Sequence, residues 1–228
     1  MGQYYYLFLD LISISFPLGG SFYKPISFYK KWHALFPAMA VMWLVYLPWD
    51  VLFTKWGVWG FNKDYLLGVD FLNLPVEEWL FFLFITYACV FIYESVVMLA
   101  PSWSPQKMTH SLFMVLGPVL IVLAVIFWGR MYTTTTFLLC GLYLGYLNWV
   151  VKPAWLGRFF VAFLFMLIPF FIINGALTGA FTPEPVVWYN DLENLSIRLW
   201  TIPIEDSIYL LFMMLITIHV YESVLKRL

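Results

Sequence analysis

The sequence predicts an all-α polytopic membrane protein with about seven transmembrane helices, arranged as two parallel three-helix repeats joined by a linker helix. Of its 228 residues, 63% are hydrophobic and only 11% are charged, whereas soluble domains carry roughly 25% charged residues. The apolar residues fall in runs long enough to cross a bilayer, and a motif that opens one run returns later in the chain. So much apolar surface cannot be buried in one soluble globule, so the expected solvent is lipid.

The composition also excludes several classes of function. The net charge is −1 and no basic run occurs, which argues against nucleic-acid binding. Cys89 and Cys140 lie inside apolar runs without metal-ligand spacing, so we interpret them as small core residues and expect no metal site. The amino terminus lacks the basic start and cleavage site of a signal peptide and is expected to stay as a membrane segment.

Seven stretches are candidates for spanning segments, each of which needs about 20 mainly apolar residues. The first is the weakest because Asp10 lies in its middle, and the fifth contains Gly141 and Gly145, which allow close helix approach. The expected segments are 3–20, 33–49, 76–99, 110–129, 132–150, 158–177 and 204–225.

Basic residues in the loops predict the orientation. Eight fall on one side and four on the other, and the richer side is expected to be cytoplasmic. This predicts a multi-pass protein of the cell membrane with its amino terminus outside and its carboxyl terminus inside. The eight are Lys24, Lys30, Lys31, Lys107, Lys152, Arg158, Lys226 and Arg227, and the four are Lys55, Lys63, Arg130 and Arg198.

The repeated motif defines the internal duplication. Leu74–Glu78 (LPVEE) returns as Ile202–Asp206 (IPIED), 128 positions later, and the run opened by each copy ends in Tyr-Glu-Ser at residues 93–95 and 221–223. Each copy is expected to begin a helix that enters the membrane with two carboxyl groups in its first turn.

The loop before each motif carries a weaker trace of the duplication. Asn62 matches Asn190 at the same offset of 128, whereas Trp59 matches Trp188 at 129. The difference predicts a one-residue insertion at Gly60.

Farther upstream, Asp50 corresponds to Asn174 at an offset of 124. The predicted units are a first three-helix repeat (1–100), a linker helix (101–131) and a second repeat (132–228). Four crossings separate the first helix from the fifth, so both copies have one orientation, as in parallel repeats around an axis along the membrane normal. A site for an elongated or two-ended ligand between the halves follows as a hypothesis.

The paired acids have two interpretations. Pro75 and Pro203 suit a first helical position, and carboxylates in the first turn satisfy free N–H groups at the positive end of the helix dipole. One such motif is adequately explained as a helix start. Two copies at the mouths of equivalent membrane helices favour a function. Burial in an apolar cleft favours the protonated form of a carboxyl group, and a pair that shares one proton can keep an acid near neutral pH.

Aromatic and amide side chains cluster in the same outer loops. Most of the tryptophans are explained by an interfacial aromatic belt. Trp59 and Trp188, which recur beside an asparagine, are instead candidates for an apolar pocket that stabilises a cation over a ring face. The candidate binding residues are Trp59, Asn62, Asn174, Trp188, Tyr189, Asn190 and Arg198.

Three other acids lie inside apolar runs. Glu94 and Glu222 are interpreted as helix-end ion-pair or packing groups, near Lys107 and Lys226. Asp10 should face a partner that the sequence does not identify.

Two three-helix copies, each with Pro-x-Glu-[Glu/Asp] at the head of its last helix, resemble the membrane-integral lycopene cyclases, here in fused single-chain form. The resemblance covers essentially the whole chain and rests on Leu74–Glu78, Ile202–Asp206, Trp49-Asp50 and the stretch from Val187 to Arg198. The sequence departs from chemical symmetry at Asn174, the counterpart of Asp50.

The resemblance implies an acid-catalysed, non-redox cyclisation of the linear ψ-ends of lycopene to β-ionone rings. An isomerase of this kind needs a protonated carboxyl in an apolar site, a second group to accept a proton, and aromatic faces beside the cation. We expect Glu77 and Glu205 to transfer protons, Glu78 and Asp206 to hold a shared proton, and Asp50 to be an alternative acid or base.

No cofactor is expected. The expected partners are lycopene or a related linear carotenoid and membrane lipid, with a homo-oligomer or an association with other carotenoid enzymes left open. The alternatives are a cyclase for C50 carotenoids or for ε- or γ-rings and, in a different class, a carotenoid-binding protein or proton-coupled transporter.

Overall fold

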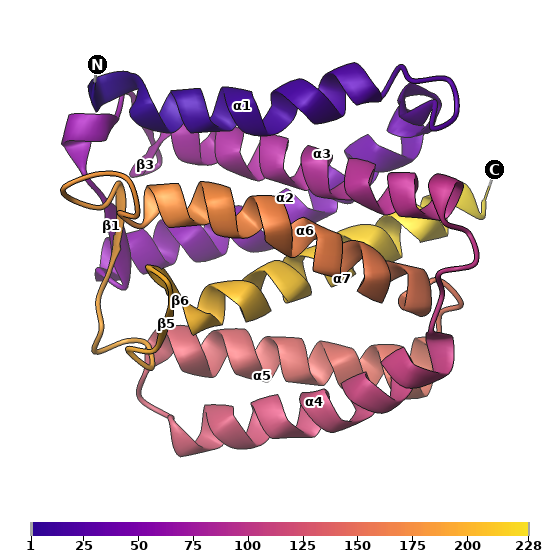
Figure 1. Ribbon diagram of the computed structural model, residues 1–228. Helices are drawn as coiled ribbons and strands as arrows, with labels where there is room; N and C mark the ends of the chain where they lie inside the picture. Colours follow the sequence, from indigo (N-terminus) through magenta and orange to yellow (C-terminus); the bar gives the residue numbers. More distant parts are fainter. Residues whose placement is uncertain (1, 228) are drawn as a thin grey trace.

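The computed structural model describes residues 2–227 and consists of seven α-helices, packed along a common direction, with short β-pairs gathered at one end (Figure 1). The helices are α1 (Tyr5–Gly20), α2 (Trp32–Trp56), α3 (Val76–Leu99), α4 (Gln106–Ile126), α5 (Met131–Tyr146), α6 (Leu156–Leu177) and α7 (Ile204–Leu225). The strands are β1 (Trp59–Phe61), β2 (Asp70–Phe71), β3 (Leu74–Pro75), β4 (Val187–Tyr189), β5 (Arg198–Leu199) and β6 (Ile202–Pro203). Four short turns of helix, at Gly2–Tyr4, Phe28–Lys31, Lys63–Tyr65 and Leu147–Val151, complete the described elements.

The architecture is the all-α polytopic bundle that the composition predicts. Six helical segments are long and apolar enough to cross a membrane, and α1 is the exception. It has 16 residues and includes the buried Asp10, yet it runs beside α3 as part of the same bundle (Figure 1). The two termini lie at opposite ends of the bundle (Figure 1).

Helix α2 is longer than the sequence predicts. The expected segment ends at residue 49, whereas α2 continues through Pro48 to Trp56. A proline inside a membrane helix is tolerated where neighbouring groups satisfy the freed carbonyl. The extension matters because Asp50 lies on it, buried inside the bundle and not in a loop.

The halves repeat the same order of elements. Helices α1, α2 and α3 correspond to α5, α6 and α7, and a short β-hairpin precedes α3 and α7 alike. The first hairpin turns at Leu72 and Asn73, both with positive φ, and the second at Trp200, whose φ is +63°. Side chains other than glycine are uncommon in this conformation, so the tight turn is a shared device that delivers the chain directly into the acid-bearing helix.

A third β-pair joins the halves. Strand β1 pairs antiparallel with β4, so that Trp59 is opposite Tyr189 and Gly60 is opposite Trp188. Gly60 and Trp188 are the central residues of this pair, so they are the equivalent positions of the two halves, and their offset is 128. The predicted insertion at Gly60, and with it the equivalence of Trp59 and Trp188, is therefore wrong.

Close helix approach at Gly141 is confirmed. A Cβ atom on Gly141 would lie 2.7 Å from the carbonyl oxygen of Gly117 on α4. The backbones of α4 and α5 are therefore too close at this point for a side chain larger than glycine. Gly145 serves differently, because the Trp149 ring occupies the space over it.

Candidate active site

The helices α3 and α7 both begin at the end of the bundle where the β-pairs gather (Figure 1), and each brings its acids inside the protein. Pro75 and Pro203 precede the first helical residue and close the preceding hairpin, one position earlier than the sequence predicts. Glu77, Glu78, Glu205 and Asp206 are all buried. The four carboxyl groups then separate into two kinds of environment.

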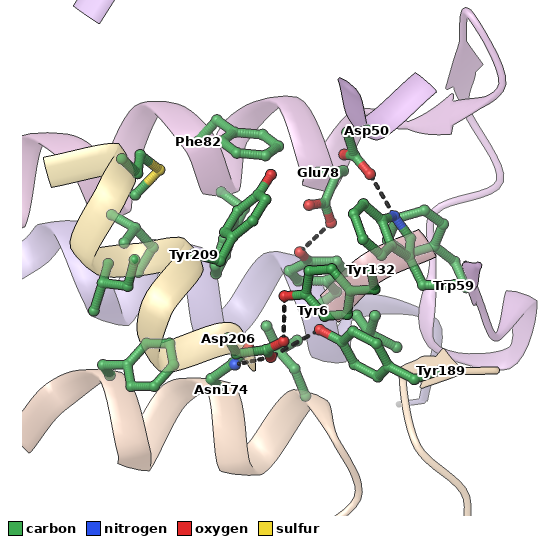
Figure 2. Close-up of a pocket in the computed structure, with 18 residues that line it drawn as sticks. Tyr6, Asp50, Trp59, Glu78, Phe82, Tyr132, Asn174, Tyr189, Asp206 and Tyr209 are labelled. Carbon is green, nitrogen blue, oxygen red and sulfur yellow. Dashed lines mark hydrogen bonds between the residues drawn. The ribbon is translucent and has the colours of Figure 1, made fainter. Parts of the chain in front are cut away.

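One carboxyl of each repeated motif lines a central cavity of about 70 Å³. Glu78 of α3 and Asp206 of α7 point into it, together with Asp50 of α2 (Figure 2). Most of the remaining wall is aromatic or aliphatic. It consists of Tyr6, Trp59, Phe61, Phe81, Phe82, Ile85, Tyr132, Phe170, Asn174, Leu177, Val187, Tyr189, Tyr209, Leu210 and Met213.

The first half contributes a pair of acids. Tyr6 donates a hydrogen bond of 2.5 Å to Oε2 of Glu78, and Asp50 is the immediate neighbour of Glu78 in the cavity wall (Figure 2). Oδ1 of Asp50 accepts a bond of 2.6 Å from the Trp59 indole N–H, while its Oδ2 is buried without a partner. Two neighbouring carboxyl groups inside an apolar wall cannot both be charged without a large cost.

The second half contributes one acid surrounded by donors. Tyr132 donates to Oδ1 of Asp206 at 2.6 Å, and Oδ2 accepts from Tyr189 at 2.9 Å and from the Asn174 amide at 2.7 Å (Figure 2). Burial, followed by the charge of Asp206, raises the pKa of Tyr189 well above its ordinary value, so this hydroxyl keeps its proton and remains a donor. Three donors directed at one carboxyl form a site that stabilises a carboxylate.

The cavity is therefore pseudo-symmetric in position and asymmetric in chemistry. Tyr6 and Tyr132 occupy matching places on α1 and α5, and each donates to the acid of its own half. Asp50 in the first half is replaced by Asn174 in the second, as the sequence comparison predicts. The second half therefore has an amide–carboxyl hydrogen bond where the first half has two neighbouring carboxyl groups.

No cation compensates these acids within the described residues 2–227. The ion pairs found there are Lys31–Glu94 and Arg198–Asp191, both outside the cavity. Aromatic rings are the nearest groups instead: the centroid of Trp59 lies 5.1 Å from that of Tyr132, and that of Tyr132 lies 6.1 Å from that of Tyr209. Their faces suit a transient cation better than a resident anion.

Glu77 and Glu205 are in the second kind of environment, outside the cavity lining. Oε1 of Glu77 accepts the backbone N–H of Leu67 at 2.6 Å, and Oε1 of Glu205 accepts the N–H of Leu195 at 2.8 Å. In both halves the acceptor lies ten residues after the donor, so each acid ties down the loop that leads into its own helix. Thr133 adds a further bond of 2.6 Å to Glu205.

The candidate binding residues also divide. Trp59, Asn174 and Tyr189 line the cavity. Trp188 does not, because side chains alternate along a strand and its neighbours Val187 and Tyr189 point inward. Trp188 is 42% exposed, whereas Trp59 is 6% exposed, and the Trp188 ring covers the outer side of Gly60.

The other three candidates stabilise the loops. Asn62 accepts the backbone N–H of Asp64, and Asn190 accepts that of Leu192, so both close local turns. The guanidinium of Arg198 lies 5.9 Å from the centre of the Tyr189 ring and pairs with Asp191 at 2.6 Å. It supports Tyr189 from outside the cavity.

The sequence interpretation missed three of the four tyrosines that line the cavity. Tyr6, Tyr132 and Tyr209 line the cavity, as does Phe82. Tyr6 and Tyr132 stand near the start of the first helix of each repeat, 126 positions apart, and that recurrence is the signal that identifies them. Tyr209 carries no such mark, because its counterpart in the first repeat is Phe81.

The three remaining acids of the apolar runs do not line the cavity. At the far ends of α3 and α7, Tyr221 donates to Glu94 at 2.7 Å and Tyr93 donates to Glu222, a reciprocal clamp between the repeats. The ion-pair partner of Glu94 is Lys31, at 2.5 Å. Asp10 lies one turn beyond Tyr6 on α1, and neither of its carboxyl oxygens has a hydrogen-bond partner.

Comparison with known protein families gives one matching family, and the match covers both halves of the chain. The sequence model described as lycopene cyclase matches two segments, residues 3–96 and 129–224, which together make up most of the chain and fit an internal repeat. The chain belongs to the lycopene cyclase family. Membership supports a carotenoid cyclase, an enzyme that acts on a carotenoid substrate. No curated protein and no solved structure matches the chain.

Proposed function

We propose that this member of the lycopene cyclase family is a lycopene β-cyclase, an isomerase that closes β-ionone rings by moving protons within one buried cavity. The observation that carries the proposal is the arrangement of three acids in the aromatic cavity. Glu78 lies beside Asp50, Asp206 opposite them accepts hydrogen bonds from three donors, and no cationic side chain of residues 2–227 lines the cavity. That combination provides an acid, a base and a shield for a carbocation in contact with a hydrocarbon.

The acid in this proposal is Glu78. Asp50 beside it makes a second negative charge unfavourable, so the pair retains a proton between them. The carboxyl of Glu78 gives that proton to the terminal C=C bond of the substrate, and a tertiary carbocation forms. The neighbouring double bond then attacks the cation, which creates the new ring C–C bond and moves the positive charge into the ring.

The base is Asp206. Its carboxylate takes a proton from a ring carbon next to the cation, and the electrons of that C–H bond restore an alkene. One proton has entered the substrate and one has left, so the product is an isomer and no redox partner is required. The catalytic cycle closes when the proton returns from Asp206 to Glu78 across the same cavity.

The aromatic wall lowers the barrier between these two transfers. Trp59, Tyr132, Tyr209 and Phe82 surround the space where the charge develops. A cation over such a ring face is stabilised by about 0.5–2 kcal/mol per ring, toward the upper value where water is absent. Water exclusion also protects the cation from capture as an alcohol.

These roles revise the expectation from sequence. The proposal gives proton transfer to Glu78 and Asp206, because they line the cavity, and gives loop anchoring to Glu77 and Glu205, because they accept backbone N–H groups. Trp59, Asn174 and Tyr189 remain proposed site residues. Arg198 is proposed to position Tyr189.

The proposed orientation follows the loop charges, with the acid cavity near the outer surface of the cell membrane and the carboxyl terminus in the cytoplasm. The units 1–100, 101–131 and 132–228 are proposed as repeat, linker and repeat. The matched family segments support the two repeats and leave residues 97–128 between them.

The test is expression in a bacterium that accumulates lycopene, followed by chromatography of the pigments. We expect the red pigment to be replaced by orange-yellow cyclic products with β-rings. Recovery of ε- or γ-rings instead would keep the cyclase and change the ring type. Lycopene that is bound but chemically unchanged would contradict the enzyme and favour a carotenoid-binding protein or transporter.

A further inference from the structure

A second cavity of about 360 Å³ lies between α1, α3 and α6. It is several times larger than the central cavity that contains Glu78, Asp50 and Asp206, which we call the acid chamber. Its wall is almost wholly hydrocarbon, with Ser13 and the Asn174 amide as its neutral polar groups. Along α3 it extends from Phe81 to Ile92, about 16 Å at ~1.5 Å per residue. We call this cavity the α1/α3/α6 groove.

The groove extends from the lipid-facing side of the bundle to the wall of the acid chamber. At its outer edge Phe16 is 79% exposed and Ile172 is 55% exposed. At its inner end Phe81, Phe170 and Asn174 line both the groove and the acid chamber. Asn174 is also the residue whose amide donates to Asp206. An elongated apolar molecule lying in the groove would therefore have its tip at the wall that the groove shares with the acid chamber.

The corresponding position in the other half is closed. The repeat relates Phe81 to Tyr209, at an offset of 128, and Phe170 to Tyr46, at 124. The ring centroids of Tyr46 and Tyr209 are 4.8 Å apart, and Trp49 stacks on Tyr46 at 5.6 Å. These rings, with Tyr46 fully buried, occupy the place between α2, α5 and α7 that corresponds to the inner end of the groove.

We propose that the α1/α3/α6 groove binds the polyene chain of the substrate while one chain end lies in the acid chamber, and that it is the single route of entry. This proposal rests on the proposed function. It follows that the enzyme closes one ring per binding event. A two-ended substrate must leave the groove and bind again in reverse before its second end reacts.

The first experiment blocks the groove at two places. Ala88→Phe adds a ring to the groove wall, and Ile12→Trp enlarges a half-exposed side chain at the mouth. The matched control is Val122→Trp, on the lipid-facing side of α4 and 55% exposed. Each variant is assayed in membranes with lycopene and with a truncated polyene that keeps one terminal end and is too short to reach Ala88 from the acid chamber.

We expect the rate with lycopene, relative to that with the truncated polyene, to fall about tenfold or more in both groove variants, the loss of affinity that corresponds to ~1.4 kcal/mol of chain burial. Val122→Trp should leave the ratio at the wild-type value. An unchanged ratio in Ala88→Phe and Ile12→Trp would overturn the groove proposal while leaving the cyclase intact. A wild-type protein that cyclises neither substrate would instead refute the proposed function.

The second experiment tests the single entry without any variant. Labelled lycopene is given to the wild-type enzyme, and a large excess of unlabelled lycopene follows within the first turnover. We expect the label to accumulate in the monocyclic product, because the second end needs a new binding event. Label that passes directly into the bicyclic product, undiluted by the chase, would show that both ends react without release.

Discussion

Neighbouring acids on α3 give the sharpest test of the proposed roles. Glu78→Gln removes the transferable proton but keeps the size of the side chain and an oxygen that can accept from Tyr6. General acid catalysis contributes about 10²- to 10⁴-fold, so the rate of ring formation should fall by that factor, roughly 3–5 kcal/mol in barrier. The amount of folded protein should change little, because Tyr6 still has an acceptor.

Glu77→Gln is the matched control one residue away. Oε1 of Glu77 accepts the Leu67 N–H, and its Oε2 has no partner, so the amide of glutamine can replace the unused oxygen without breaking the loop contact. We expect a rate within about twofold of wild type and a stability loss of at most about 1 kcal/mol.

The assay measures initial rates of lycopene conversion in isolated membranes. The rates are divided by the amount of folded protein, measured as the fraction that stays soluble in detergent after heating to a series of temperatures. The opposite ranking, with a normally folded Glu77→Gln inactive and Glu78→Gln active, would refute the assignment of the cavity-facing acid. Equal rates in both variants and wild type would refute proton transfer by this helix.

Three further predictions use the same membranes. Asp206→Asn should lose both the base and a hydrogen bond, because the amide nitrogen cannot accept from Tyr132. We expect the rate to fall about 10²- to 10⁴-fold and the free energy of unfolding to fall by about 1–3 kcal/mol. Near-normal turnover would exclude Asp206 as the base. Tyr132→Phe removes one of three donors to Asp206, so the rate should fall only about fivefold, equivalent to ~1 kcal/mol, and a loss as large as that of Asp206→Asn would mean that Tyr132 itself moves the proton. Gly141→Leu should separate α4 from α5 and lower the stability of the folded protein by about 1–3 kcal/mol, with the rate per folded molecule unchanged. Gly19→Leu should be neutral, because a Cβ atom there meets nothing within 4 Å. Equal stability of the two glycine variants would contradict the close approach.

Local sequence patterns were sufficient for the bundle and for the neighbourhood of the site. A chain with 11% charged residues has to place its helices in lipid, and a motif repeated at 128 positions has to place equivalent acids at equivalent helix starts. The same reasoning connected Asp50 with Asn174 and so predicted that the halves differ chemically, a difference that the cavity retains. These inferences depend on composition and spacing, which the chain carries without reference to its neighbours.

Only the tertiary structure decided which side chains face the chamber. Glu77 and Glu78 differ by about 100° around the helix axis, and α3 is apolar on every side, so no polar stripe reveals how the helix is rotated. Packing against α1 and α7 sets that rotation and brings in Tyr6 from 72 residues away. The register of β1 against β4 turned Trp59 inward and Trp188 outward. Aromatic packing closed one of two equivalent grooves, because contacts between distant segments, and not spacing along the chain, determine which space stays open.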